Sequence, residues 1–154
     1  MQYSKPLTRT VILALAGLGV SGYLVWYDFL TRTGVCLLTG FFGCSAILAS
    51  PCSRIFGIPL ALVGFIWFLV IALLAALVAR DSKWLKFLLV WSIIGLIGVI
   101  GLAYTELFLI GAICPFCTSA HVLGILILAL TIAMWKKRSQ RIKSEPRIAT
   151  SHGK

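Results

Sequence analysis

Four long apolar segments, separated by short polar stretches, dominate the pattern of this 154-residue chain. They cover approximately residues 11–30, 56–79, 84–109 and 114–135. Each is near the roughly 20 residues that a helix needs to cross the hydrocarbon core of a bilayer. The pattern therefore predicts an all-α integral membrane protein, built as a four-transmembrane-helix bundle. The first segment lacks a small-x-small cleavage site, so we expect it to be retained rather than removed as a signal peptide.

The composition agrees with a membrane protein. Of all residues, 60% are hydrophobic and 12% are charged, which is more apolar surface than a soluble domain of this size can bury. The formal net charge is +10, but the basic residues concentrate directly after the last apolar segment. Such a cluster is typical of a cytoplasmic or lipid-facing tail rather than of a nucleic-acid surface. We therefore expect a membrane domain over residues 1–135, a disordered basic tail over 136–154, and no nucleic-acid partner.

The distribution of basic residues also predicts the orientation, because lysine and arginine accumulate on the cytoplasmic side of membrane proteins. Outside the tail, the basic residues that decide the orientation are Lys5, Arg9, Arg80, Lys83 and Lys86. The first connection, about residues 31–55, has only two arginines, and the third connection has none. We therefore expect both termini and the second connection in the cytoplasm. The other two connections then face the extracytoplasmic side of the plasma (inner) membrane.

The long first connection is unusually apolar for a loop. Irregular backbone cannot contact lipid with unpaired polar groups, so residues 44–49 are expected to form a short helix in the membrane interface. Pro51 and Pro59 then mark the turn into the second span.

Small residues are frequent in the predicted spans. Gly95, Gly98 and Gly101 follow one another at three-residue spacing within the third span. Glycine lets two helices approach closely in a bilayer. We therefore expect these glycines to lie at a contact between helices rather than to contact a ligand.

All cysteines lie in, or at the edge of, the two connections predicted to face outward. They are Cys36, Cys44, Cys52, Cys114 and Cys117. Disulfides form and persist outside the cytoplasm, so the cysteine placement and the predicted orientation agree. The motif Cys114-Pro115-Phe116-Cys117 stands at the start of the fourth span. A C-x-x-C motif indicates either a redox pair or half of a metal site.

Two cysteine pairs suggest a route for electrons. A bridge across two residues adds little stabilisation, so Cys114 and Cys117 favour redox chemistry over a structural bridge. Thiol–disulfide exchange would connect Cys114 to the loop pair of Cys36 and Cys44. Cys117 lies one helical turn deeper, so we expect it to face an acceptor inside the membrane. A quinone is the natural acceptor, because the sequence shows no haem, flavin or iron–sulfur pattern.

Several motifs occur together in an order that resembles one known family. Cys36-x7-Cys44 is followed by the run Cys44–Ser50, then by Phe56-Gly57-Ile58-Pro59-Leu60, and finally by the C-x-x-C motif. This ordered set resembles the bacterial homologues of vitamin K epoxide reductase, over about residues 10–135. The resemblance implies the same four-helix fold and the same thiol:quinone chemistry that the spans and cysteines indicate.

The resemblance also implies roles for individual residues. Cys36 matches the exposed loop cysteine that meets a thioredoxin-like partner, and Cys44 matches the shuttle that bridges transiently to Cys114. Cys117 matches the quinone-facing cysteine. Ser50 matches a serine or threonine whose hydroxyl helps to polarise the quinone or to order the loop. Without the resemblance, this serine would be an ordinary turn residue.

The chain departs from the family pattern at several positions. Animal relatives have an asparagine near the start of the second span that donates to the quinone, whereas this chain has no asparagine and Ser53 lies nearest to that place. Their tyrosine one turn past the C-x-x-C is replaced by His121, which either serves the quinone or the thiolate, or bonds a neighbouring residue. Glu106 is either an interface residue or part of a proton path. Cys52 has no assigned role.

The predicted function is that of a membrane thiol:quinone oxidoreductase that supports disulfide bond formation. Many bacterial relatives carry a fused thioredoxin-like domain, which we expect this chain to lack. Electrons would then come from a separate thioredoxin-fold, DsbA-like protein outside the cytoplasm and end on a menaquinone, ubiquinone or related quinone. One alternative is a DsbB-type disulfide oxidase, although its C-x-x-C lies in the first outward loop. A non-enzymatic alternative is a membrane scaffold with structural disulfides or zinc.

Overall fold

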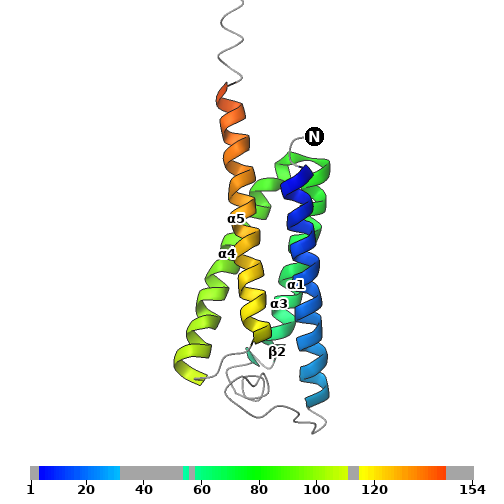
Figure 1. Cartoon of the computed structure of the whole chain (residues 1–154), viewed down its shortest axis with the longest axis vertical. Helices are drawn as coiled ribbons and strands as arrows, with labels where there is room; N and C mark the ends of the chain where they lie inside the picture. Colours follow the sequence, from blue (N-terminus) through cyan, green and yellow to red (C-terminus); the bar gives the residue numbers. More distant parts are fainter. Residues whose placement is uncertain (1–3, 32–53, 56–57, 111–114, 145–154) are drawn as a thin grey trace, which may run out of the picture.

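The computed structural model describes residues 4–31, 54–55, 58–110 and 115–144 (Figure 1). Within these residues, four helices are long and apolar enough to cross a membrane. They are α1 (Ser4–Thr31), α3 (Leu60–Arg80), α4 (Leu85–Tyr104) and α5 (Pro115–Ser144). The predicted four-helix membrane bundle is therefore confirmed. The predicted interfacial helix over residues 44–49 lies outside the described residues.

The helices run side by side, with alternating directions along the chain (Figure 1). α1 packs against α3 and α5, and α4 packs against α5 and α3. One end of the bundle, named here the basic end, carries the start of α1, the turn over residues 81–84 and the end of α5. The other end, named the cysteine end, carries the end of α1 and the starts of α3 and α5. α4 continues there as the π-helical segment η3 (Thr105–Ile110) and leans away from α5.

The entry to α3 begins later than the sequence predicts. A short antiparallel pair of strands, β1 (Arg54–Ile55) and β2 (Ile58–Pro59), precedes the helix. Pro59 is the N-cap of α3 and has an extended backbone, with φ −62° and ψ 133°. Because proline has no backbone N–H, it can precede the first helical turn without losing a hydrogen bond. The prediction that Pro59 marks this turn is confirmed, and the helix itself starts at Leu60 rather than near Phe56.

α5 extends farther than the sequence predicts. The apolar pattern ends at Trp135, but the helix continues to Ser144. Lysine, arginine and glutamine are good helix formers, and neither glycine nor proline occurs between residues 136 and 144. Adding residues to an existing helix is also much easier than starting one. The disorder predicted for the tail is therefore wrong for residues 136–144, and residues 145–154 lie outside the described part of the chain.

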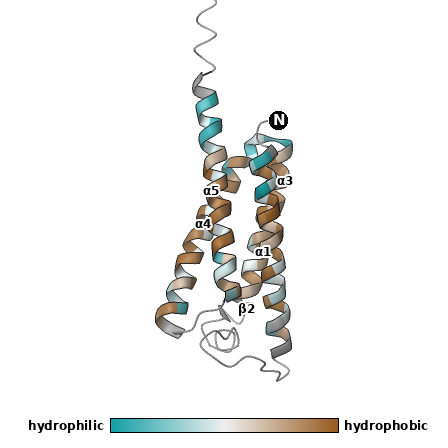
Figure 2. Ribbon diagram, in the orientation of Figure 1, coloured by the Kyte–Doolittle hydropathy of each residue, from teal (hydrophilic) through white to brown (hydrophobic). Residues whose placement is uncertain are grey.

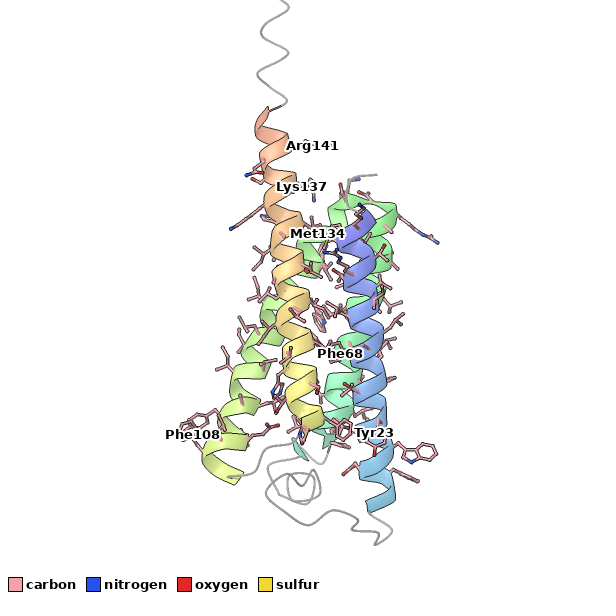
Figure 3. All side chains as sticks on the ribbon, viewed as in Figure 1. Tyr23, Phe68, Phe108, Met134, Lys137 and Arg141 are labelled. Atoms are coloured by element: carbon pink, nitrogen blue, oxygen red, sulfur yellow. The ribbon has the colours of Figure 1, made fainter. Side chains whose placement is uncertain are left out.

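α1 and α3 approach each other closely at a glycine. A Cβ atom on Gly17 would come within 2.3 Å of the Phe68 ring, so a larger residue would force the two helices apart. Phe68 is only 3% exposed and lies about midway along the bundle (Figure 3). Its ring meets the ring of Trp67 edge to face, with centroids 4.9 Å apart. These two aromatic side chains form the centre of the bundle.

A pair of tryptophans joins α3 to α4. Trp67 Nε1 donates to the backbone oxygen of Trp91 at 3.3 Å, and Trp91 Nε1 donates to that of Trp67 at 3.4 Å. A Cβ atom on Gly95 would come within 2.1 Å of the Trp67 ring. The close packing predicted for this glycine is therefore present. Cβ atoms on Gly98 and Gly101 would meet nothing within 4 Å, so the prediction is wrong for these two positions, where α4 diverges from its neighbours.

Three buried hydroxyls inside the spans are satisfied by their own helices. Thr10, Ser92 and Thr131 are buried, and each hydroxyl donates to the carbonyl oxygen four residues earlier, at 3.0, 2.8 and 2.8 Å. A membrane core offers no water for such groups, so these bonds allow hydroxyls in the interior. The outer surface is strongly apolar along the middle of the bundle, whereas the basic end of α5 is hydrophilic (Figure 2). This pattern fits a lipid-exposed surface.

The two glycine environments on α4 predict different effects of the same substitution. Gly95→Ala should lower the free energy of unfolding by about 1–3 kcal/mol, because the methyl group collides with the Trp67 ring. Gly101→Ala should be neutral or stabilising by up to about 1 kcal/mol, because it meets nothing and reduces backbone entropy. Thermal unfolding of the purified protein in a mild detergent measures both. Equal effects of the two variants would contradict the role assigned to the Trp67 contact.

Candidate functional site

The start of α5 places two of the predicted site residues on one face. Pro115 is the first residue of the helix, where its missing N–H costs no hydrogen bond. Cys117 and His121 are four residues apart, so their side chains lie on the same side of α5. Both are half-buried, and both line one cavity inside the bundle. The sulfur and the imidazole therefore face a common space.

This cavity lies toward the cysteine end and has a volume of about 290 Å³. Side chains from all four helices form its wall. Apart from the Trp67 indole, the wall residues with polar or ionisable groups are Ser21 of α1, Thr105 and Glu106 of η3, and Cys117 and His121 of α5. The remaining wall is aliphatic, aromatic or glycine. Ligand sites typically combine such an apolar wall with a few polar groups that orient the ligand.

Among the α3 residues of the cavity wall, Trp67 and Phe68 lie farthest from the cysteine end, and Phe68 is about midway along the bundle (Figure 3). The Trp67 ring reaches both neighbouring helices. It occupies the space where a side chain on Gly95 of α4 would lie. It would also lie 3.6 Å from a Cβ atom on Gly124 of α5. The two glycines therefore admit the indole between the helices. The result is an aromatic floor that separates the cavity from the packed basic half of the bundle.

The cavity opens sideways, between α3 and α4. Val63 and Ile94 belong to its wall, yet they are 47% and 50% exposed. Gly98 also lines the cavity and has open space where a side chain would be. Because the outer surface at this level is apolar, the opening faces the hydrocarbon of a surrounding bilayer. A lipid-soluble molecule can therefore reach the cavity from the membrane.

Two polar residues inside the spans add to the site. Glu106 is 8% exposed and lies in the cavity wall, so it is not an exposed residue of the membrane surface. Carboxylates inside a membrane domain are expensive and usually functional. Ser21 is 3% exposed and was not predicted as a site residue. The available signal was a lone serine in an apolar stretch, next to Gly22.

Only part of the predicted site can be placed. Cys117 and His121 are brought together at the cavity, as described above. The remaining predicted site residues, Cys36, Cys44, Ser50, Ser53 and Cys114, lie outside the described residues. Their roles stay predictions.

Comparison with known protein families identifies the family of this chain. The family model described as Vitamin K epoxide reductase family matches residues 9–132. This chain belongs to the vitamin K epoxide reductase family. The resemblance seen in the sequence is thus confirmed over most of the chain, although no curated protein matches it. Members of the vitamin K epoxide reductase family are oxidoreductases, and membership indicates membrane thiol–disulfide oxidoreductase activity for this chain.

The geometry of the cavity predicts how Cys117 reacts with external reagents. In a variant that keeps Cys117 as its only cysteine, an uncharged aromatic maleimide should label the thiol faster than a charged maleimide, because the wall is apolar. Gly98→Leu should slow labelling by the uncharged reagent several-fold, since the new side chain enters the cavity. Gly101→Leu, one turn along the same helix and outside the cavity wall, is the matched control. Similar labelling rates in both variants would contradict access through this opening.

Proposed function

We propose that this protein is a thiol:quinone oxidoreductase that oxidises a separate thioredoxin-fold, DsbA-like protein and so supports disulfide bond formation. The observation that carries the proposal is the position of Cys117 in the wall of an apolar, membrane-embedded cavity that opens toward lipid. A redox thiol in such a place meets lipid-soluble acceptors more readily than water-soluble ones. Family membership supports the thiol–disulfide half of the reaction.

The cavity has the features that a quinone requires. A quinone has a flat ring, two carbonyl oxygens and, in membranes, a long apolar tail. The aromatic floor of Trp67 and Phe68 suits the ring, and the side opening between α3 and α4 leaves a route for the tail. Ser21 and His121 can each donate a hydrogen bond to a carbonyl oxygen. These wall residues would hold the ring with one edge toward Cys117.

The proposed reaction balances in electrons and protons. Two thiols of the partner become a disulfide, and exchange through mixed disulfides passes the two electrons to Cys36 and Cys44, then to Cys114 and Cys117. Oxidation of the inner pair to a disulfide releases two electrons and two protons. A bound menaquinone, ubiquinone or related quinone supplies the acceptor for both. Glu106 and His121 lie in the same wall and can hold protons beside the site. Ser50 and Ser53 complete the proposed quinone contacts.

The proposed location is the plasma (inner) membrane, with both termini in the cytoplasm and the cysteines on the other side. The basic end of the bundle supports this orientation, because it combines the start of α1, the turn over residues 81–84 and the basic end of α5 (Figure 2). Lysine and arginine at one end of all these segments follow the positive-inside rule.

The first test of the proposal removes the sulfur at the cavity. Cys117→Ser should abolish quinone reduction by membranes supplied with a reduced thioredoxin-fold protein, because the inner disulfide can no longer form. Cys52→Ser should leave the rate unchanged, since Cys52 has no part in the proposed relay. The measurement is the change in quinone absorbance together with the thiol count of the partner. Continued turnover in Cys117→Ser would overturn the proposal and favour the scaffold alternative.

The second test concerns the imidazole in the wall. His121→Phe removes a hydrogen-bond donor and should raise the KM for a short-chain ubiquinone analogue about five- to tenfold, which is the typical effect of one lost hydrogen bond. The KM for the protein partner should stay constant. His121→Gln keeps a donor and should recover most of the affinity. An equal rise of both KM values would indicate a general structural defect instead.

A further inference from the structure

A second pocket lies at the basic end, between α4 and α5 and away from the cysteine site. Its volume is about 450 Å³, and it is open to the outside. Its wall residues are Lys83, Lys86, Phe87, Trp135, Arg138 and Ser139. Three of them are cations, one carries a hydroxyl and two are aromatic. None of the six is a carboxylate, so the pocket is suited to an anion.

Aromatic rings hold two of the cations beside the pocket. Lys86 Nζ lies 5.4 Å from the ring centroid of Phe87 on α4, and Arg138 Cζ lies 6.0 Å from that of Trp135 on α5. Such cation–π contacts stabilise a charge without neutralising it. Each helix therefore contributes a positive group and an aromatic ring to the same pocket.

The turn between α3 and α4 forms a further part of the pocket wall. Arg138 Nη1 donates to the backbone oxygen of Ser82 at 2.5 Å, which uses one of the five N–H donors of the guanidinium. The Lys83 ammonium lies 3.4 Å from Asp81 Oδ2. The Lys83 backbone N–H also donates to Asp81 at 2.9 Å, and this bond lowers the pKa of that carboxyl. One ionised carboxylate thus stands beside three cations, and the pocket keeps a positive excess.

An apolar stripe on α4 continues from the pocket. Phe87, Val90, Ile94 and Ile97 follow at three- and four-residue spacing and are 52%, 56%, 50% and 67% exposed. Residues at this spacing share one face of a helix. The stripe leads from the basic end toward the cysteine end, along the lipid-facing side of the bundle. The combined surface therefore matches a molecule with an anionic head and a long hydrocarbon tail.

We propose that the pocket binds the phosphate of an anionic glycerophospholipid, whose acyl chains lie along the stripe on α4. The planar guanidinium of Arg138 suits phosphate oxygens, Lys83 and Lys86 add charge, and the Ser139 hydroxyl can donate a further hydrogen bond. Basic pockets between membrane helices are suited to lipid headgroups of this kind. The headgroup pocket shares no residue with the cysteine cavity, although Ile94 of the stripe also lines that cavity. The proposal does not depend on the proposed quinone reaction.

Native mass spectrometry of the full-length protein, released from a neutral detergent, tests this site. The apparent Kd of the first bound phosphatidylglycerol should be clearly lower than that of phosphatidylcholine with the same acyl chains. Lys83→Gln with Lys86→Gln should raise the phosphatidylglycerol Kd about fivefold for each lysine removed. Binding of phosphatidylcholine should not change.

The matched control removes equal charge from the same end of the bundle. Lys5→Gln with Arg9→Gln alters two exposed cations on α1 that do not line the pocket, and should change the Kd less than twofold. Arg138→Lys provides a third variant, because it keeps the charge and loses the planar fork. It should weaken binding by less than the double lysine variant. Thermal unfolding of every variant verifies that it is folded.

Three results would overturn the proposal. Equal binding of the two phospholipids would show that the pocket does not recognise the anionic headgroup. Equal weakening by the pocket and control variants would show that only diffuse surface charge acts. Displacement of phosphatidylglycerol by an equal concentration of inorganic phosphate would show that the pocket takes a free anion and that the stripe contributes nothing.

Discussion

The position of the Trp67 indole determines how the interior of the bundle is divided. The ring occupies space that two glycines leave open, on α4 and on α5, and its N–H donates to the backbone of Trp91. On one side of this ring the helices are closely packed. On the other side α4 leans outward and the cavity begins (Figure 1). One large side chain in the interior of the bundle thus separates the closely packed half from the half that holds the cavity.

The number of helices and their type followed from the apolar pattern, because a bilayer allows few other solutions. The ends of the helices were harder to predict. Pro59 delayed α3, and the basic helix formers after Trp135 prolonged α5, since hydropathy reports where lipid begins but not where a helix stops. The divergence of α4 was not predictable from glycine spacing. Gly95 and Gly98 look alike in the sequence, and only the partner helix distinguishes them.

The candidate site, like the fold, could be predicted from the sequence only in part. Cys117 and His121 could be predicted because a C-x-x-C motif and its next helical turn are local features. Ser21 and the inward position of Glu106 depend on how distant spans pack, which local patterns do not report. The family resemblance supplied an order of motifs, and it was confirmed by the match over residues 9–132. It carried no information on the basic pocket, which arises from α4, α5 and the turn between α3 and α4.

α5 connects the two halves as one continuous rod. Cys117 and Arg138 are 21 residues apart, which corresponds to about 32 Å along a helix axis, close to the hydrocarbon thickness of a bilayer. A membrane much thinner than this would change the depth of either Cys117 or Arg138 unless the helix tilts. The depth of the thiol is therefore coupled mechanically to the thickness of the surrounding lipid. The length of this helix therefore fixes the distance between the thiol and the basic end of the bundle along the helix axis.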